Sequence, residues 1–364
     1  MMPPNQAKRR LLAIDAARGS LTHHTTDALP TLLSRGDLVV VNDAATLPAS
    51  IRMRVSVTGE LVELRLASEI TNNTARAVLF GKGDFRIRTE DREPPPVLHA
   101  GTVLVSEQSR ATGHEALRCM IASVDSTSPR LVAVRFIGDE LAVLDSLYRT
   151  GVPIQYAHER EPLSLYAVQT LFATRPFAVE PPSATFALSF GALRELNKRG
   201  VGVASLTHAA GLSATGDPLL DARLPLEERF VLPEKTARAV EDALVRNTRV
   251  VAIGTTVARA LESAIRIGDG RIAFGEQRTA LRLGRTEPRR VVHAIVTGVH
   301  APNTSHFELL HAFAGEDLLA RASAEATHAG YREHEFGDNV IVLAEKVDGS
   351  RSREARAGVA EALC

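Results

Sequence analysis

Tryptophan is absent from this 364-residue chain, and only 4% of its residues are aromatic although 45% are hydrophobic. We therefore expect a core built mainly from Val, Leu, Ile and Ala, and the hydrophobic share is normal for a globular protein. The length is sufficient for two ordinary domains.

Cysteine is almost absent, because Cys119 and Cys364 are the only two. Such a pair indicates neither a disulfide framework nor a cysteine-rich zinc site. No apolar run approaches the ~18 residues of a membrane-spanning helix, and the N-terminal residues lack the apolar stretch of a secretory signal. We therefore expect a cytoplasmic protein with no membrane partner.

An excess of one charge is also missing, because 43 basic residues balance 43 acidic ones, and nearly all of the basic residues are arginine. Proteins that bind nucleic acids usually carry a basic excess or a basic stripe. The balance argues against a nucleic-acid binder, although a neutral chain can still carry a local basic patch.

Short alternating runs fill the chain from about residue 52 to 138, among them LVELRL, ARAVLF and RLVAVRF. Turn residues separate them, and none of the runs has a helical period. This pattern is typical of a small antiparallel barrel or sandwich. After residue 139, helix-type segments alternate with apolar runs such as VGVASL, RVVAIG and NVIVLAE, which predicts an α/β domain with a parallel or mixed sheet.

The segment RVVAIGTTVARALES, residues 249–263, predicts a strand, a tight turn and a helix. The strand is Val250–Ile253, Gly254 allows the turn, and the hydroxyls of Thr255 and Thr256 can cap the helix. Arg259 is expected on the face opposite the buried stripe. A helix N-terminus after a strand can bind a carboxylate or a phosphate. The alternative is two capping threonines and a solvated arginine.

A second candidate region is VVHAIVTGVHAPNTSHFELLHAFAG, residues 291–315. It predicts a strand at Val291–Val296, a loop with His300 and Pro302, and a helix that begins near residues 303–305. His300 follows the carboxyl end of a strand, where open α/β sheets place their ligands. The alternative is a structural or solvent-exposed loop histidine.

On that helix, His306, Glu308 and His311 add three ionisable side chains. Glu308 and His311 are three residues apart and can touch. His306 and His311 are five apart, whereas an HExxH zinc site needs histidines four apart. We therefore expect no metal, and the interpretation of these positions as polar surface residues is favoured.

Two further candidates for a general base lie between these regions. His208 follows a predicted strand in a loop rich in Gly, Ser and Thr, and Glu228 stands beside Glu227 in RLPLEERFVLP. Either His208 or Glu228 could remove a proton if it is buried near a substrate. Adjacent glutamates are usually exposed, and this is the interpretation favoured for Glu227.

Four segments, in order, resemble motifs of the S-adenosylmethionine:tRNA ribosyltransferase-isomerase family of queuosine biosynthesis. They are GDLVVVNDAATLPASI (36–51), IGTTVARALES (253–263), TGVHAPNTSHFELLHAFAG (297–315) and YREHEFGDNVIV (331–342). PSATFALSF and LEERFVLP are weaker matches. The resemblance spans nearly the whole chain. The expected fold class is therefore α/β: a discontinuous, barrel-like α/β domain of residues 1–51 and 150–364, with an inserted small antiparallel β-barrel domain of residues 52–149.

The resemblance also implies a reaction, in which the ribosyl group of S-adenosylmethionine is transferred and isomerised onto a 7-aminomethyl-7-deazaguanine in tRNA, with release of adenine and methionine. It implies acid/base roles for His300, His208 and Glu228, and a carboxylate clamp made by Thr255, Thr256 and Arg259. The remaining S-adenosylmethionine-binding positions that it implies are Gly254, Asn42, Asp43, Pro302 and Asp338.

Several polar positions of the family pattern are replaced, and they fall in loops, where substrates are usually held. The replacements are Ala44, Ala45, Ser50, Thr185, Ala187, Arg223, Leu226 and Gly298. Three hypotheses follow: the tRNA activity persists; a paralogue binds S-adenosylmethionine but acts on a small molecule; or the protein binds without turnover. The sequence does not predict the oligomeric state.

Overall fold

This computed structural model describes residues 9–107, 115–302, 304–334 and 336–344. Cys364 and Asn303 lie outside the described residues. The chain falls into two compact units: unit 1 is Met1–Asp43, Ser183–His208 and Arg229–Cys364, and unit 2 is Ala44–Pro182 and Ala209–Glu228. Independent folding is a separate property, so the domain boundaries expected from the sequence stay a prediction.

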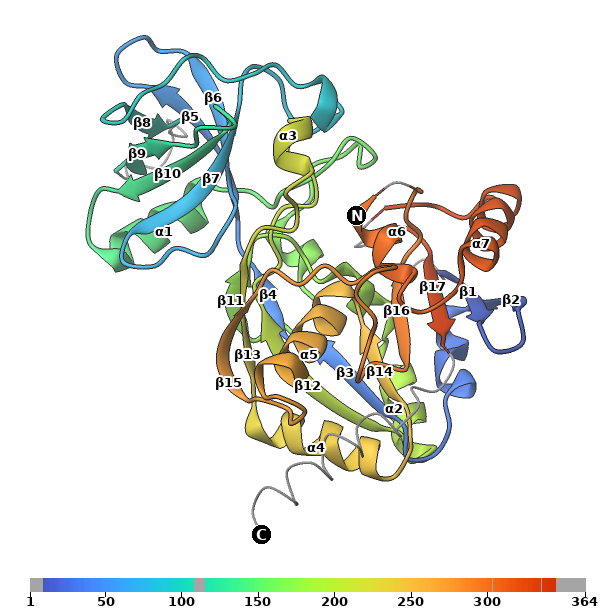
Figure 1. Ribbon diagram of the computed structural model, residues 1–364. Helices are drawn as coiled ribbons and strands as arrows, with labels where there is room; N and C mark the ends of the chain where they lie inside the picture. Colours follow the sequence, from blue (N-terminus) through green and yellow to red (C-terminus); the bar gives the residue numbers. More distant parts are fainter. Residues whose placement is uncertain (1–8, 108–114, 303, 335, 345–364) are drawn as a thin grey trace. The chain divides into compact units, whose positions relative to one another are not determined.

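Unit 1 is built on one mixed sheet of nine strands (Figure 1). In sheet order these are β15 (Gly275–Thr279), β13 (Glu228–Leu232), β12 (Gly202–His208), β3 (Leu38–Asn42), β14 (Val250–Ile253), β16 (Ala294–Gly298), β17 (Asn339–Leu343), β1 (Arg10–Asp15) and β2 (Ser20–Thr25). The neighbours β12, β3, β14 and β16 all run parallel, whereas β13 runs antiparallel to β12, and β17 runs antiparallel to β16 but parallel to β1. The four parallel strands therefore end at one edge of the sheet.

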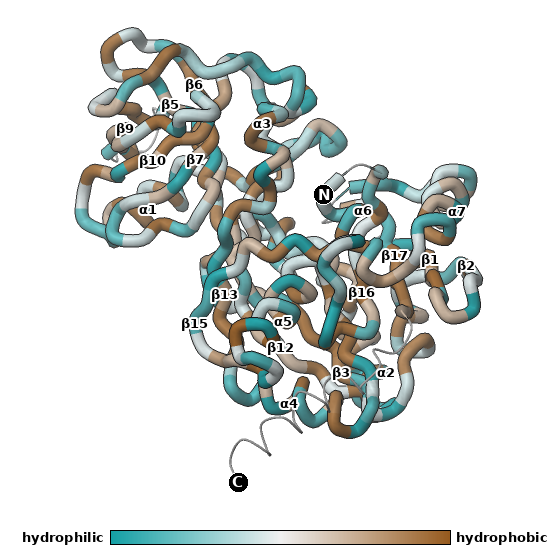
Figure 2. Tube along the Cα trace, viewed as in Figure 1, coloured by the Kyte–Doolittle hydropathy of each residue, from teal (hydrophilic) through white to brown (hydrophobic). Residues whose placement is uncertain are grey.

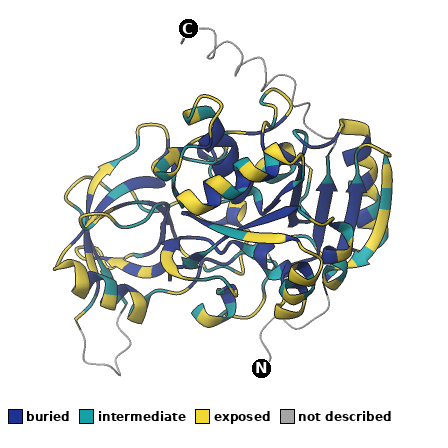
Figure 3. Ribbon diagram, turned by 90° about the horizontal axis from the view of Figure 1, so that it is seen from below, coloured by how far each residue is buried: buried dark blue, intermediate teal, exposed yellow. Residues whose placement is uncertain are grey.

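The central strands are apolar along their whole length, as strands covered on both faces must be. Every residue of β3 and β14 is buried, and β14 confirms the strand expected at residues 250–253. Helices pack against this sheet, and Figure 3 shows its strands dark blue while the helices keep exposed outer faces. The helices of this core are α4 (Glu234–Val245), α5 (Thr255–Ile267), α6 (Ser305–Leu310) and α7 (Glu316–His328). Unit 1 also contains α2 (Phe190–Lys198) and a 3-10 turn, η5 (Ser183–Ala187).

Unit 2 contains a closed antiparallel barrel of six strands. Around the barrel the order is β10 (Leu131–Phe136), β7 (Thr74–Phe80), β6 (Leu61–Leu66), β5 (Ser50–Val55), β8 (Val103–Ser106) and β9 (Arg118–Val124). Helix α1 (Glu140–Thr150), the short α3 (Pro218–Asp221) and the paired strands β4 (Ala44–Thr46) and β11 (Arg175–Ala178) complete the unit. The barrel and the large mixed sheet confirm the expected fold class.

The apolar side chains of the two units form two separate cores, and in Figure 2 the brown, hydrophobic residues gather along the strands. Cys119 belongs to the barrel core, and its burial raises the pKa of its thiol to about 12. Among the described residues, no helix is long and apolar enough to cross a membrane.

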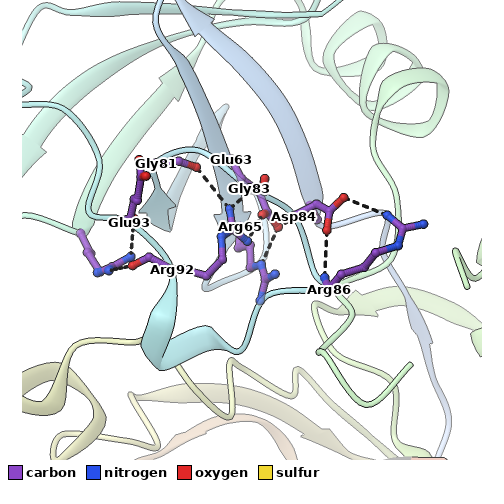
Figure 4. Close-up of polar contacts among 10 residues, drawn as sticks. Glu63, Arg65, Gly81, Gly83, Asp84, Arg86, Arg92 and Glu93 are labelled. Carbon is purple, nitrogen blue, oxygen red and sulfur yellow. Dashed lines mark hydrogen bonds and ion pairs between the residues drawn. The ribbon is translucent and has the colours of Figure 1, made fainter. Parts of the chain in front are cut away.

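A buried polar cluster interrupts the barrel core (Figure 4). The Glu63 carboxylate accepts hydrogen bonds from Arg65 Nε at 2.6 Å and from Arg92 Nη1 at 2.7 Å, and a third from Ser50 Oγ at 2.8 Å. Burial acts to raise the pKa of Glu63, but the two guanidinium groups hold it below its usual value. Both guanidinium groups also lie over the Phe80 ring, 4.8 and 5.0 Å from its centre, so the cluster is enclosed by an aromatic face.

Candidate functional site

The candidate residues of unit 1 gather where the parallel strands end. Asn42 ends β3, His208 ends β12, Gly254 follows β14, and Gly298 ends β16 two residues before His300. Because these strands are neighbours and parallel, their carboxyl ends form one continuous edge. Open α/β sheets bind ligands at this edge.

Asn42 and His208 are joined by a reciprocal pair of hydrogen bonds. Asn42 Nδ2 donates to the carbonyl oxygen of His208 at 3.0 Å, and the His208 N–H donates to Asn42 Oδ1 at 2.9 Å. Both residues are completely buried. Asn42 Nδ2 also lies 3.5 Å from Thr256 Oγ1, which links β3 and β12 to the start of α5.

The ring of His208 has a defined proton arrangement. Its Nδ1 lies 2.7 Å from the carbonyl oxygen of Thr256, and a carbonyl only accepts hydrogen bonds. Nδ1 therefore carries the proton, and Nε2 carries the lone pair when the ring is neutral. The ring also packs on Phe230, with centroids 6.0 Å apart, which fixes its plane.

The neighbouring Asp43 joins the same two strands. Its carboxylate accepts hydrogen bonds from Ser205 Oγ at 2.7 Å and from Thr207 Oγ1 at 2.6 Å, both on β12. Asp43 therefore crosses from the end of β3 to β12 and holds the strand that carries His208.

Helix α5 begins differently from the sequence expectation. Its N-cap is Gly254, with φ of 99° and no side-chain cap, so the prediction that threonine hydroxyls cap the helix is wrong. This backbone conformation favours glycine. A Cβ there would also lie 3.5 Å from the Cβ of Ala184 on η5. Thr255 and Thr256 are the first helical residues and are half-buried.

The expectation for Arg259 is also wrong in one respect, because its side chain is buried rather than solvated. Every residue of α5 from Val257 to Ile265 is buried. Arg259 Nε donates to the carbonyl oxygen of Leu281 at 2.9 Å, and Ser263 Oγ lies 2.6 Å from Thr279 Oγ1. The chain that follows α5 covers the face that the sequence pattern predicts to be exposed.

Glu262 is an important residue that the sequence analysis missed. It is completely buried, and its carboxylate accepts hydrogen bonds from the N–H groups of Arg290, Val291 and Val292 at 2.7–2.9 Å. The sequence predicts that this strand begins at Val291, but β16 begins at Ala294. The reason is that the N–H groups of Val291 and Val292 donate to Glu262 and not to a neighbouring strand. A glutamate among the apolar residues of ARALES was the available signal.

His300 lies beyond the end of β16 and is half-buried. Its Nε2 is 3.0 Å from Thr297 Oγ1, and its ring stacks on that of His306, with centroids 4.6 Å apart and planes inclined by 16°. Pro302 is exposed in the same loop. Helix α6 starts at Ser305, as expected, and the Thr304 side chain caps it by accepting from the N–H of Phe307.

The three ionisable residues of α6 divide between two surroundings. His306 joins His300, whereas His311 lies 3.8 Å from Glu308 and 3.2 Å from Arg285, which confirms that Glu308 and His311 touch. Within the described part of the chain, no group of three or more His, Cys, Asp or Glu side chains is arranged to hold a metal ion.

Asp338 is buried just before β17, and its carboxylate is fully engaged. It accepts hydrogen bonds from the N–H groups of Arg10 and Arg332 at 2.8 and 2.9 Å, and Arg10 Nη2 pairs with it at 2.9 Å. Burial acts to raise the pKa of Asp338, but these donors hold it below its usual value. The carbonyl oxygen of Asp338 accepts a hydrogen bond from the N–H of Val299, which joins Asp338 to the loop that contains His300.

Glu228 and Glu227 differ in burial, as the sequence analysis favoured. Glu228 is 8% exposed and accepts a hydrogen bond from the N–H of Gly211 at 2.7 Å within unit 2. Glu227 is exposed. Glu228 therefore holds the loop that follows His208 in the chain.

One buried hydroxyl near the start of α5 is unusual. Thr185 on η5 is 1% exposed, and its Oγ1 has no hydrogen-bond partner among the described residues. Its neighbour Ala184 is the residue that approaches Gly254. A buried unsatisfied hydroxyl costs about 1–3 kcal/mol, so this position calls for a partner that the protein itself does not supply.

Comparisons with known proteins agree on one family. The family model described as "Queuosine biosynthesis protein" matches residues 2–342. The chain is similar to the S-adenosylmethionine:tRNA ribosyltransferase-isomerases of Sorangium cellulosum, at 33% identity over 93% of each chain, and of Thermus thermophilus, at 31% identity over 93% of this chain and 94% of the relative. The crystal structure of an S-adenosylmethionine tRNA ribosyltransferase from Thermotoga maritima covers 94% of each chain, at 20% identity and a TM-score of 0.48.

Proposed function

The chain belongs to the queuosine biosynthesis protein family, and we propose that it is an S-adenosylmethionine:tRNA ribosyltransferase-isomerase. The observation that carries the proposal is the similarity to relatives of that name along 93% of both chains. The proposed reaction transfers and isomerises the ribosyl group of S-adenosylmethionine onto the aminomethyl group of a 7-deazaguanine in tRNA, and releases adenine and methionine.

This reaction requires a base, an acid and a clamp. The positive sulfur of S-adenosylmethionine acidifies the adjacent C5′ protons, so a modest base can remove one of them. An acid must assist the departure of adenine, and a clamp must hold the methionine carboxylate. Each group must be positioned before the reaction begins, because reorganisation during the reaction would cost activation free energy.

His208 is well suited to be the base. Its Nδ1 proton is directed at the carbonyl oxygen of Thr256, so the neutral ring offers Nε2 as the proton acceptor. Asn42 fixes the backbone of His208 from the adjacent strand. His300 and Glu228 are the other acid/base candidates; His300 lies farther along the same sheet edge, and Glu228 holds the loop after His208.

The start of α5 is suited to be the clamp. A helix N-terminus whose cap residue has no side chain leaves its first N–H groups and the helix dipole for an anion. Thr255 and Thr256 add hydroxyl groups, and Arg259 lies one turn farther along the helix. Asn42, Asp43, Pro302 and Asp338 complete the proposed ligand-binding set, in which Asp43 and Asp338 act by holding the strands and loops of the edge.

The test is to incubate the protein with S-adenosylmethionine and to measure adenine and methionine, with and without tRNA that carries 7-aminomethyl-7-deazaguanine. Release that depends on this tRNA is the expected result. Equal release without tRNA would instead identify a small-molecule reaction. An absence of S-adenosylmethionine binding in calorimetry would overturn the proposal entirely.

A further inference from the structure

The strongest local departure from charge balance lies in the chain after α5. Residues 271–290 contain six arginines and two glutamates, a net charge of +4 in a protein whose total is zero. We call this segment the arginine strap. It includes β15, an edge strand of the nine-stranded sheet that lies beside α5 (Figure 1).

The inner side of the strap is fixed to α5 at three levels. The carbonyl oxygen of Leu281 accepts from Arg259, the hydroxyl of Thr279 meets Ser263, and the N–H of Arg290 donates to Glu262. These contacts use backbone atoms and a threonine hydroxyl. At these three contacts, the strap is therefore held against α5 by atoms other than its guanidinium groups.

The outer side of the strap is basic. Arg271, Arg278, Arg282 and Arg290 are all exposed. Arg285 is exposed too, and it pairs with Glu316 on α7. Guanidinium groups bind phosphates through paired donors and release counterions from the nucleic acid when they do so.

An exposed aromatic residue accompanies these charges. Phe274, immediately before β15, is 58% exposed. Aromatic side chains beside basic residues are typical of surfaces that bind single-stranded RNA, since an unpaired base can stack on the ring while phosphates contact the cations.

From these observations we propose that the arginine strap is the surface of unit 1 that binds the sugar–phosphate backbone of the RNA substrate. This inference rests on the proposed function, which names tRNA as the acceptor, and adds where the RNA is held. Because the strap is bonded to residues 259–263 of α5, RNA bound there lies beside the helix that we propose to clamp S-adenosylmethionine.

The test compares two triple variants. R278A/R282A/R290A removes three exposed arginines of the strap, and R194A/R199A/R246A removes three exposed arginines elsewhere in unit 1. Binding of unmodified tRNA is measured by fluorescence anisotropy over a series of salt concentrations, and S-adenosylmethionine binding is measured by calorimetry.

The strap variant is expected to bind tRNA at least about 10-fold more weakly, and the slope of log affinity against log salt should fall by about 0.9 for each phosphate that the variant no longer neutralises. The control variant should match the wild type, and both should bind S-adenosylmethionine normally. If the two variants bound tRNA with equal affinity, the arginine strap would not be the RNA-binding surface, and the proposed function would be unaffected. A wild-type protein that binds no tRNA would overturn both, and equal binding of duplex DNA would reduce the strap to a general polyanion patch.

Discussion

The barrel and the sheet edge each contain a buried polar cluster, and the two clusters are built on opposite principles. In the barrel, the Glu63 carboxylate is paired with the guanidinium groups of Arg65 and Arg92. At the sheet edge, His208 and Asn42 are positioned by backbone groups. The first arrangement places opposite charges against one another inside the barrel, whereas the second orients the ring of His208 through a backbone carbonyl group.

The variant His208→Gln is expected to have the largest effect, and that effect is on the reaction rate. Loss of a general base typically lowers the rate 100- to 10,000-fold, and kcat for adenine release should fall by about that factor. The affinity for S-adenosylmethionine should change little, because the proposed clamp lies on α5. A kcat within a few-fold of the wild type would remove His208 from the acid/base set.

The converse variant is Glu63→Gln in the barrel. It leaves two buried guanidinium groups without their counter-charge, which should destabilise the protein by about 3–5 kcal/mol. Urea unfolding followed by circular dichroism measures this loss, and Glu60→Gln, on an exposed carboxylate of the same unit, is the matched control. If Glu63→Gln proved as stable as Glu60→Gln, the pairing of Glu63 with its two arginines would not stabilise the fold.

The same glutamate sets a pH dependence. The pKa of Glu63 in the folded state lies below the ordinary value of 4.5. Its contribution to stability is therefore complete above about pH 4.5 and is lost as the pH falls through the lower folded-state pKa. The wild type should lose stability over this acidic range more steeply than Glu63→Gln, and parallel curves would contradict the assignment.

Much of the sheet edge could be predicted from the sequence, because consecutive apolar residues followed by glycine specify β14 and the start of α5. The burial of Arg259 could not, since residues 279–281 cover it from elsewhere in the chain. The barrel cluster was missed for a related reason. In LVELRL the polar Glu63 and Arg65 alternate with Val62, Leu64 and Leu66, and this pattern is typical of an exposed polar face. All five residues are buried here.

A smaller effect on stability is expected from Glu262→Gln, because this carboxylate accepts from the N–H groups of residues 290–292 and pairs with one guanidinium group, that of Arg266. One amide oxygen can still accept from some of the N–H groups of residues 290–292, so the loss should be about 1–3 kcal/mol. Urea unfolding measures it, with Glu234→Gln on the surface of α4 as the control. A loss of stability larger than that of Glu63→Gln would show that Glu262 contributes more to stability than the carboxylate in the barrel does.

The last expected effect concerns Arg259 and distinguishes a role in binding the ligand from a role in holding the neighbouring chain. A charge-assisted hydrogen bond contributes about 1.5–3 kcal/mol, so Arg259→Ala should weaken S-adenosylmethionine binding roughly 10- to 100-fold. The same variant should bind 5′-methylthioadenosine normally, because that molecule lacks the methionine carboxylate. Calorimetry with both ligands separates the two roles. If both affinities fell equally, Arg259 would act only by holding Leu281 and the strap, and the proposed clamp would be reduced to the N-terminus of α5 and its two threonines.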